Sequence, residues 1–210
     1  MKIFVTYCPF GFSNCYILGT DALDDESPRD AIVVDPGSVE QPMLGFIEKH
    51  DYTVRGILVT HDHIGHVHGL RTLKRIYDAE IYAVSPMVRE YKTRILKDGE
   101  ILHLGSIDAE VITVPGHSSD SVVFRVGHTL FTGDAISAGN VGSTISSYGM
   151  TIQINALRSK VLSLPGDHIL LPGHGPPTSL DAERQFNAGI QEYDLFKTRR
   201  KKFRIDTSFE

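Results

Sequence analysis

Four apolar segments of this 210-residue chain end in the same way, and this repetition constrains the fold more than any other feature. Each segment is typical of a buried strand, and the loop after it carries a glycine together with histidine or aspartate. The four segments, each with its loop, are Gly56–Thr60 with 61–66, Val111–Val114 with 115–117, Leu130–Thr132 with 133–134, and Ile169–Leu171 with 172–174. Because strands fix the loops beyond their ends, we expect these side chains to gather at one edge of a sheet.

Strands and helices also alternate along the rest of the chain. Short apolar runs predict further strands at Lys2–Tyr7, Asn14–Leu18, Ala31–Asp35, Val54–Val59, Glu80–Val84, Glu110–Val114, Ser121–Val126, Thr129–Phe131 and His168–Leu171. Apolar spacing predicts helices at Val39–Asp51, Gly69–Tyr77 and Ile152–Leu164, and Thr20–Asp30 is typical of a hairpin loop. A last helix should begin near Ser179, capped by Ser179 or Thr178, with Glu183 closing a capping box. This order favours an α/β fold in which two sheets pack face to face with helices outside.

Composition sets the domain count and the expected partners. We find no linker, and we expect one domain over residues 1–195 followed by a basic tail over 196–210, interpreted as a solvated terminus. The net charge of −5 gives no reason to expect nucleic acid, and no apolar run approaches the roughly 20 residues that span a membrane. Cys8 and Cys15 are too few for a disulfide framework, which favours a reducing, cytoplasmic setting. Both thiols should be buried, and nothing in the sequence predicts a lowered pKa for either.

Histidine is the informative residue type, with ten in the chain. His61 and His63 are two apart in one loop, so both rings can reach one ion, whereas His66 can point to a second ion. Imidazoles with a carboxylate suit zinc, iron or manganese better than calcium or magnesium. The candidate metal ligands are His61, His63, His66, His117, Asp134 and His174. The other histidines lack such a context, and we expect no special role for His50, His68, His103, His128 and His168.

At this point the residues resemble the metallo-β-lactamase-fold hydrolases, and in particular their glyoxalase II-like branch. Thr60–His66 is similar to the T-H-x-H-x-D-H signature, and further matches follow in order from about residue 3 to about residue 190. The matching pieces are Asn14-Cys15-Tyr16, Asp35-Pro36-Gly37, Pro115-Gly116-His117-Ser118, Gly133-Asp134 and Pro172-Gly173-His174-Gly175. The resemblance implies a four-layer αββα sandwich with two metal sites.

The resemblance also implies a role for each ligand. By position, His61, His63 and His117 would hold the first ion. His66 and His174 would hold the second ion, and Asp134 would bridge the two. The family's nucleophile is a metal-bound hydroxide, which Asp134 and His66 would help to hold in place.

Gly65 departs from this signature, because the family has an aspartate there that binds the second ion and orients the attacking water. Three outcomes stay open. The chain could bind one ion at the first site. It could bind two ions with additional water. Asp62 or His68 could also replace the missing ligand.

Three other features bear on the substrate. Asp120 stands where relatives often have glycine, and Ser143 stands near the place where glutathione-thioester hydrolases commonly have a basic residue. The chain is also too short for the separate helical region that glyoxalase II uses for glutathione. These features put glutathione in doubt as the substrate.

The leading hypothesis is a hydrolase of a small-molecule ester, thioester or lactone that uses one or two zinc ions, or iron or manganese. A mononuclear iron oxygenase of the persulfide dioxygenase type is the first alternative, and a non-catalytic metal-binding relative is the second. Nucleic-acid processing, which the fold also supports, has only the basic tail in its favour.

Overall fold

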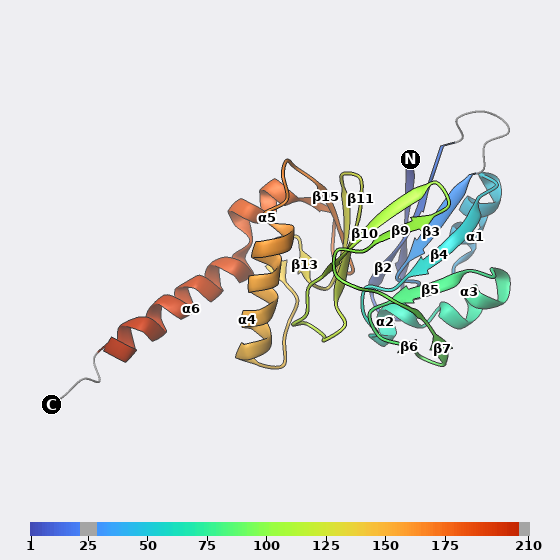
Figure 1. The fold of residues 1–210 in the computed structure, drawn as a ribbon. Coiled ribbons are helices and arrows are strands. Elements are labelled where there is room, and N and C mark those ends of the chain that lie inside the picture. The colour runs from blue at the N-terminus through green and yellow to red at the C-terminus, as the bar shows by residue number, and fades with distance from the viewer. Residues whose placement is uncertain (22–28, 206–210) are drawn as a thin grey trace.

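The structure is a computed structural model that describes residues 1–21 and 29–205, with side chains described up to Thr198. Most of the expected loop Thr20–Asp30 lies outside the described residues. Two six-stranded sheets form the centre of the molecule (Figure 1). The first sheet has the order β1 (Lys2–Cys8), β2 (Ser13–Gly19), β3 (Asp30–Val34), β4 (Thr53–Leu58), β5 (Glu80–Ala83), β8 (Arg94–Ile95). The second has the order β16 (Thr178–Ser179), β15 (Ile169–Pro172), β12 (Thr129–Gly133), β11 (Val122–Val126), β10 (Ile107–Thr113), β9 (Ile101–Leu104).

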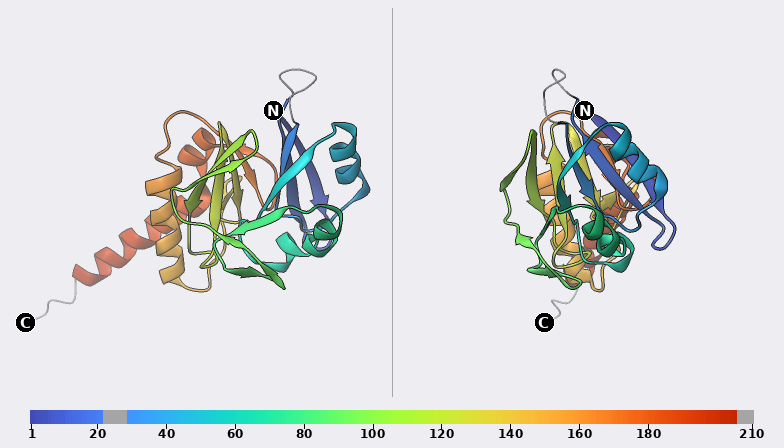
Figure 2. Two further views of the ribbon diagram at one scale, coloured as in Figure 1. Left: turned by 45° about the vertical axis from the view of Figure 1, so that its right-hand side comes forward. Right: turned by 90° about the vertical axis from the view of Figure 1, so that its right-hand side faces the viewer.

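Helices cover the outer face of each sheet (Figures 1 and 2). On the side of the first sheet lie α1 (Gln41–Lys49), α2 (Ile64–Val67) and α3 (Leu70–Ile76). On the side of the second lie α4 (Ser147–Ala156), the π-helical segment η1 (Leu157–Val161), α5 (Leu180–Phe186) and α6 (Ala188–Ile205). Two small two-stranded sheets complete the fold, β6 (Met87–Val88) with β7 (Tyr91–Lys92) and β13 (Ile136–Ser137) with β14 (Asn140–Val141).

Three buried apolar clusters separate these four layers. Successive residues of β2 show why, because Ile17 packs toward the helices α1 and α3 whereas Leu18 packs toward the second sheet. Leu58 and Phe131 meet in the cluster between the sheets. The third cluster joins the second sheet to α4, η1 and α5. Inner strands such as β3 and β12 are buried on both faces and have continuous apolar sequences, whereas the edge strands β1 and β9 expose alternate residues. The αββα sandwich expected from the sequence is confirmed.

Strand direction brings the four ligand-bearing loops together. In the first sheet, β4 runs parallel to β3 and β5. In the second, β12 is parallel to β15, and β10 runs in the same direction because both β10 and β12 are antiparallel to β11. The loops after β10, β12 and β15 therefore leave the same edge of the second sheet, facing the loop after β4.

Two helix predictions are wrong in detail. Helix α4 begins at Ser147, five residues before the predicted start at Ile152, because the Ser146 hydroxyl caps it by accepting a hydrogen bond from the Gly149 amide. Ser179 does cap α5, by accepting from the Ala182 amide, but Glu183 forms no capping box. Its carboxylate accepts instead from the Gly139 amide and the Thr178 hydroxyl.

The last helix also differs from the expectation of one helix near Ser179. An extended residue, Asn187, separates α5 from α6, and α6 continues through Ile205. Figure 2 shows the end of α6 running away from the rest of the molecule. No helix within residues 1–21 and 29–205 is long and apolar enough to cross a membrane. The domain boundary at 195/196 stays a prediction.

Candidate metal centre

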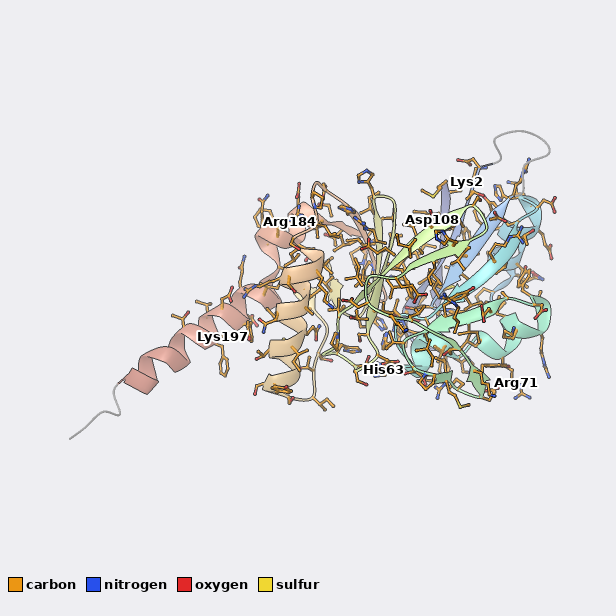
Figure 3. All side chains as sticks on the ribbon, viewed as in Figure 1. Lys2, His63, Arg71, Asp108, Arg184 and Lys197 are labelled. Carbon is orange, nitrogen blue, oxygen red and sulfur yellow. The ribbon has the colours of Figure 1, made fainter. Side chains whose placement is uncertain are left out.

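The structure brings all six predicted ligands together at the junction of the two sheets. His61, His63 and His66 come from the loop and short helix after β4, whereas His117, Asp134 and His174 follow β10, β12 and β15. Figure 3 places His63 at this edge of the molecule. The six side chains form two overlapping groups, and Asp134 belongs to both.

The first group contains His61, His63, His117 and Asp134. Nε2 of His117 lies 3.1 Å from Nδ1 of His63 and 3.5 Å from Oδ2 of Asp134. Nε2 of His61 lies 3.9 Å from the same Oδ2. The second group contains His66, His174 and Asp134, and its three atom pairs lie 3.3 to 3.5 Å apart.

These distances fit a pair of transition-metal ions. Ligand atoms about 2.1 Å from a tetrahedral ion lie roughly 3.4 Å from one another, which is close to the spacing found in both groups. Nε2 of His61 and Oδ1 of Asp134 are buried and have no hydrogen-bond partner. Such atoms are costly to bury unless something else binds them. The residues present therefore fit a metal ion in each group.

Hydrogen bonds fix the orientation of three imidazoles. Nδ1 of His117 donates to the Ser143 carbonyl oxygen at 2.8 Å, and Nδ1 of His174 donates to the Phe12 carbonyl oxygen at 2.9 Å. Since a carbonyl only accepts, the proton lies on Nδ1 in both rings and Nε2 keeps a free lone pair. Nδ1 of His66 lies 3.0 Å from Oδ2 of Asp35. All three Nε2 atoms are thus directed into the site.

Asp35 is a positioning residue that the sequence did not single out, except as part of a matching motif. Its Oδ1 accepts from the Thr60 amide at 2.8 Å, and its Oδ2 accepts from the Thr60 hydroxyl at 2.6 Å. The Thr60 hydroxyl has then used its proton, so it accepts from Nδ1 of His61 at 3.0 Å. One buried carboxylate therefore orients His66 directly and His61 through Thr60. Its position directly after a buried strand was the available signal.

The site favours a positive charge on His66 but not on His61. Burial and the neighbouring His66 hold the pKa of His61 far below its usual value, so this imidazole is neutral at pH 7. Burial would also lower the pKa of His66, but the adjacent carboxylates of Asp134 and Asp35 outweigh it and raise that pKa to about 10. Burial would raise the pKa of Asp134, but the adjacent imidazole of His66 outweighs it, so this pKa lies well below its usual range. A metal ion would take the place of the His66 proton.

Two glycines leave space that the site requires. A Cβ atom on Gly173 would lie 2.5 Å from both Oδ1 of Asp134 and Cε1 of His66. Gly133, with φ of 48°, approaches Thr60 so closely that a Cβ atom would lie 2.3 Å from its hydroxyl oxygen. Both positions therefore require a residue without a side chain.

Neither Asp62 nor His68, which the sequence offered as possible replacement ligands, reaches the site. Asp62 lies 3.9 Å from Nε of Arg89, and its amide donates to Asp120. His68 stacks on Phe10 with ring centroids 3.9 Å apart. Within the described residues, the possible metal-binding groups include neither side chain. Asp120 connects two loops, because its Oδ2 accepts hydrogen bonds from the Asp62 backbone amide and the Ser85 hydroxyl.

Cys8 and Cys15 are buried, as expected, but the expectation that neither thiol has a lowered pKa is wrong for Cys8. A hydrogen bond with Cys15, followed by others with Ser38, outweighs burial and lowers the pKa of Cys8 to about 6. The pKa of Cys15 is raised for the complementary reason, its hydrogen bond to Cys8 and its burial. Ser38, which is distant from both cysteines in the chain, bonds to Cys8, and the sequence could not indicate this contact.

A groove of about 560 Å³ adjoins the loop that holds His117. Helix α6, the start of α4 and the β14 region line it. Its lining residues are Asn140, Val141, Ser143, Met150, Gly189, Glu192, Tyr193 and Phe196.

Known proteins with similar sequences and folds agree with this arrangement. The family profile described as the metallo-beta-lactamase superfamily matches residues 8–184. The hydroxyacylglutathione hydrolase GloC of Haemophilus influenzae is 29% identical over 199 residues, which cover 83% of this chain and 91% of that protein.

Two solved structures share the fold. ETHE1 from Myxococcus xanthus has a TM-score of 0.78 at 22% identity, and the match covers 92% of this chain and 88% of that chain. TTHA1623, solved in a di-iron-bound form, has a TM-score of 0.72 at 25% identity, over 88% of this chain and 98% of that chain. The sandwich fold thus has well-matched counterparts among solved structures.

Proposed function

The chain belongs to the metallo-beta-lactamase superfamily, and on that premise we propose that it is a metal-dependent hydrolase of a small-molecule ester, thioester or lactone. One observation carries the proposal: the two oxygens of Asp134 lie between two groups of imidazole nitrogens at the spacing of ligands around two ions. Relatives named hydroxyacylglutathione hydrolase support hydrolysis as the reaction class.

Each side chain has a defined task in this proposal. His61, His63 and His117 would hold the first ion, His66 and His174 would hold the second, and Asp134 would bridge them. When bound, the ions would supply a water of lowered pKa and polarise the substrate carbonyl. Asp134 and His66 would hold the attacking water between the two groups. Asp35, Ser143 and Phe12 would keep the imidazoles oriented during turnover.

The groove beside His117 suggests where the rest of the substrate lies. Among the side chains that the structure describes, its lining contains one carboxylate, that of Glu192, and neither lysine nor arginine. Glutathione has two carboxylates, which this lining would not neutralise. We therefore expect an uncharged thioester or lactone to bind better than a glutathione thioester.

The test is hydrolysis by protein loaded with zinc, manganese or iron, measured on a panel of glutathione thioesters, uncharged thioesters, lactones and phenyl esters. We expect turnover that requires metal, with a lower KM for uncharged thioesters. The variant His117→Ala should lose turnover, whereas Gly45→Ala, at a position where a Cβ atom meets nothing within 4 Å, should keep it. Fully loaded protein that hydrolyses no member of the panel would contradict the proposal.

Two alternatives give different results in the same experiment. The second group of ligands has two histidines and one carboxylate, a set that also suits iron(II) and dioxygen chemistry. Oxygen consumption by the iron-loaded protein, without hydrolysis, would favour the oxygenase. Metal binding without either reaction would favour a non-catalytic role.

A further inference from the structure

The hairpin turn between β1 and β2, residues 9–12, lies against the second group of ligands. The carbonyl oxygen of Phe12 accepts the hydrogen bond from Nδ1 of His174. Phe12 has φ of 53°, in the left-handed region that a bulky residue rarely adopts. Strained residues of this kind persist where the surroundings impose them. Here the unusual backbone conformation accompanies the hydrogen bond to a candidate ligand.

The first residues of β2 tie down both loops that carry the second group. The Ser13 hydroxyl donates to the Gly65 carbonyl oxygen at 2.7 Å, next to His66. The backbone amide of Asn14 donates to the Gly173 carbonyl oxygen at 2.7 Å. Its side-chain Nδ2 donates to the Gly175 carbonyl oxygen at 2.8 Å. His174 lies between these two acceptors. The hairpin thus holds the neighbours of both histidines, one from each sheet.

Gly11 and Gly65 pack backbone to backbone. A Cβ atom on Gly11 would lie 2.3 Å from Cα of Gly65, so no side chain fits there without a shift of the main chain. A Cβ atom on Gly65 would lie 3.1 Å from Cα of Gly11. The turn therefore occupies the direction in which an aspartate side chain at position 65 would leave the backbone.

We propose that the β1–β2 turn compensates for the missing signature aspartate by positioning His66 and His174, and that Gly65 is required for the turn to seat. The turn acts through the backbone and adds no charged ligand. The second ion would keep an open coordination position. This inference rests on the two-ion site of the proposed function, but it concerns metal affinity rather than turnover.

The experiment measures zinc per chain and the two zinc dissociation constants by chelator competition, with a melting curve for each variant. Phe12→Pro fixes φ near −65° and turns the carbonyl away, whereas Phe12→Gly allows the native φ. Gly11→Ala and Ser13→Ala weaken the seating of the turn. Gly65→Asp restores the signature, and Gly45→Ala is the matched control.

We expect Phe12→Pro and Gly11→Ala to lower the affinity for the second ion about tenfold or more. The affinity for the first ion should change by less than about twofold. Ser13→Ala should act in the same direction and serves if the other variants fail to fold. Gly45→Ala should keep both constants, Phe12→Gly should weaken binding of the second ion less than Phe12→Pro does, and Gly65→Asp should give no gain at the second site. A tenfold tighter second ion in Gly65→Asp, or unchanged constants in both Phe12→Pro and Ser13→Ala, would overturn the inference. A chain with two ions and these variant effects but no hydrolysis would contradict only the proposed function.

Discussion

The carboxylate of Asp35 and the imidazole of His66 form a buried ion pair, with Oδ2 3.0 Å from Nδ1. Both side chains are almost fully inaccessible to solvent. The same carboxylate accepts two hydrogen bonds from Thr60, so it connects the loop after β3 to the loop after β4. The orientation of His66 is therefore set by groups in the protein interior, independently of any ion.

Replacing the carboxylate of Asp35 should lower the affinity of the protein for the second ion. Asn is compatible with the φ of 50° at position 35, but it has one acceptor oxygen for three donor groups. We expect Asp35→Asn to lower the affinity for the second ion by about 10- to 100-fold. Chelator competition with zinc measures the change. Asp78→Asn, at an exposed carboxylate that lies near Lys74, should leave both constants as they are.

Ligand removal should separate a bridging residue from a residue of one group. Asp134→Ala removes a carboxylate that belongs to both groups, whereas His174→Ala affects one. We expect Asp134→Ala to lose most of both ions and His174→Ala to lose one, as measured by elemental analysis of dialysed protein. An Asp134→Ala chain that still holds two ions would show that this residue does not bridge. His103→Ala, at an exposed ring far along the sheet, is the control.

A single methyl group should block the site. In Gly173→Ala the new Cβ atom would lie 2.5 Å from Oδ1 of Asp134 and from Cε1 of His66, and both side chains are held by buried contacts. We expect zinc content and turnover to fall at least tenfold, while circular dichroism at 25 °C stays close to that of the wild type. Zinc content equal to that of Gly45→Ala would show that the site can expand to admit the methyl group.

Asp30 should contribute stability that depends on pH. Burial would raise the pKa of Asp30, but hydrogen bonds from Arg55 and Ser106 outweigh it, so the folded-state pKa lies below the usual value of 3.8. The ionised group therefore stabilises the fold above about pH 4, and this contribution disappears as the pH falls through the lower folded-state pKa.

We expect Asp30→Asn to lose about 1.5–3 kcal/mol in the free energy of unfolding at pH 7. The difference from the wild type should shrink below about pH 4, and urea unfolding at pH 7 and pH 3 measures it. Asp108→Asn, at an exposed carboxylate, should change the free energy of unfolding by much less. A difference that grows toward low pH would contradict the assignment.

Much of this architecture is readable from the sequence because it depends on local patterns. Apolar runs such as Ile57–Val59 have the length of buried strands, and the loops after them carry the ligands at recognisable spacing. Strand direction then decides that His117 and Asp134 meet His61, and parallel pairing follows from the intervening helices.

The parts that could not be predicted depend on contacts between distant segments. Glu183 binds Gly139 across 44 residues, so its carboxylate was unavailable for a capping box. The lowered pKa of Cys8 depends on Ser38 and Cys15, and the seat of Gly65 depends on Gly11. None of these pairings leaves a periodic signal in the sequence.

The six candidate ligands divide evenly between the two sheets, with His61, His63 and His66 on one side and His117, Asp134 and His174 on the other. An ion held by both sets would act as a cross-link between the two halves of the sandwich. Like a disulfide, such a link would restrict the unfolded chain, because it joins segments more than 50 residues apart. The metal would then serve both the reaction and the packing of the two sheets. The two halves of the sandwich would separate more readily in protein treated with a chelator.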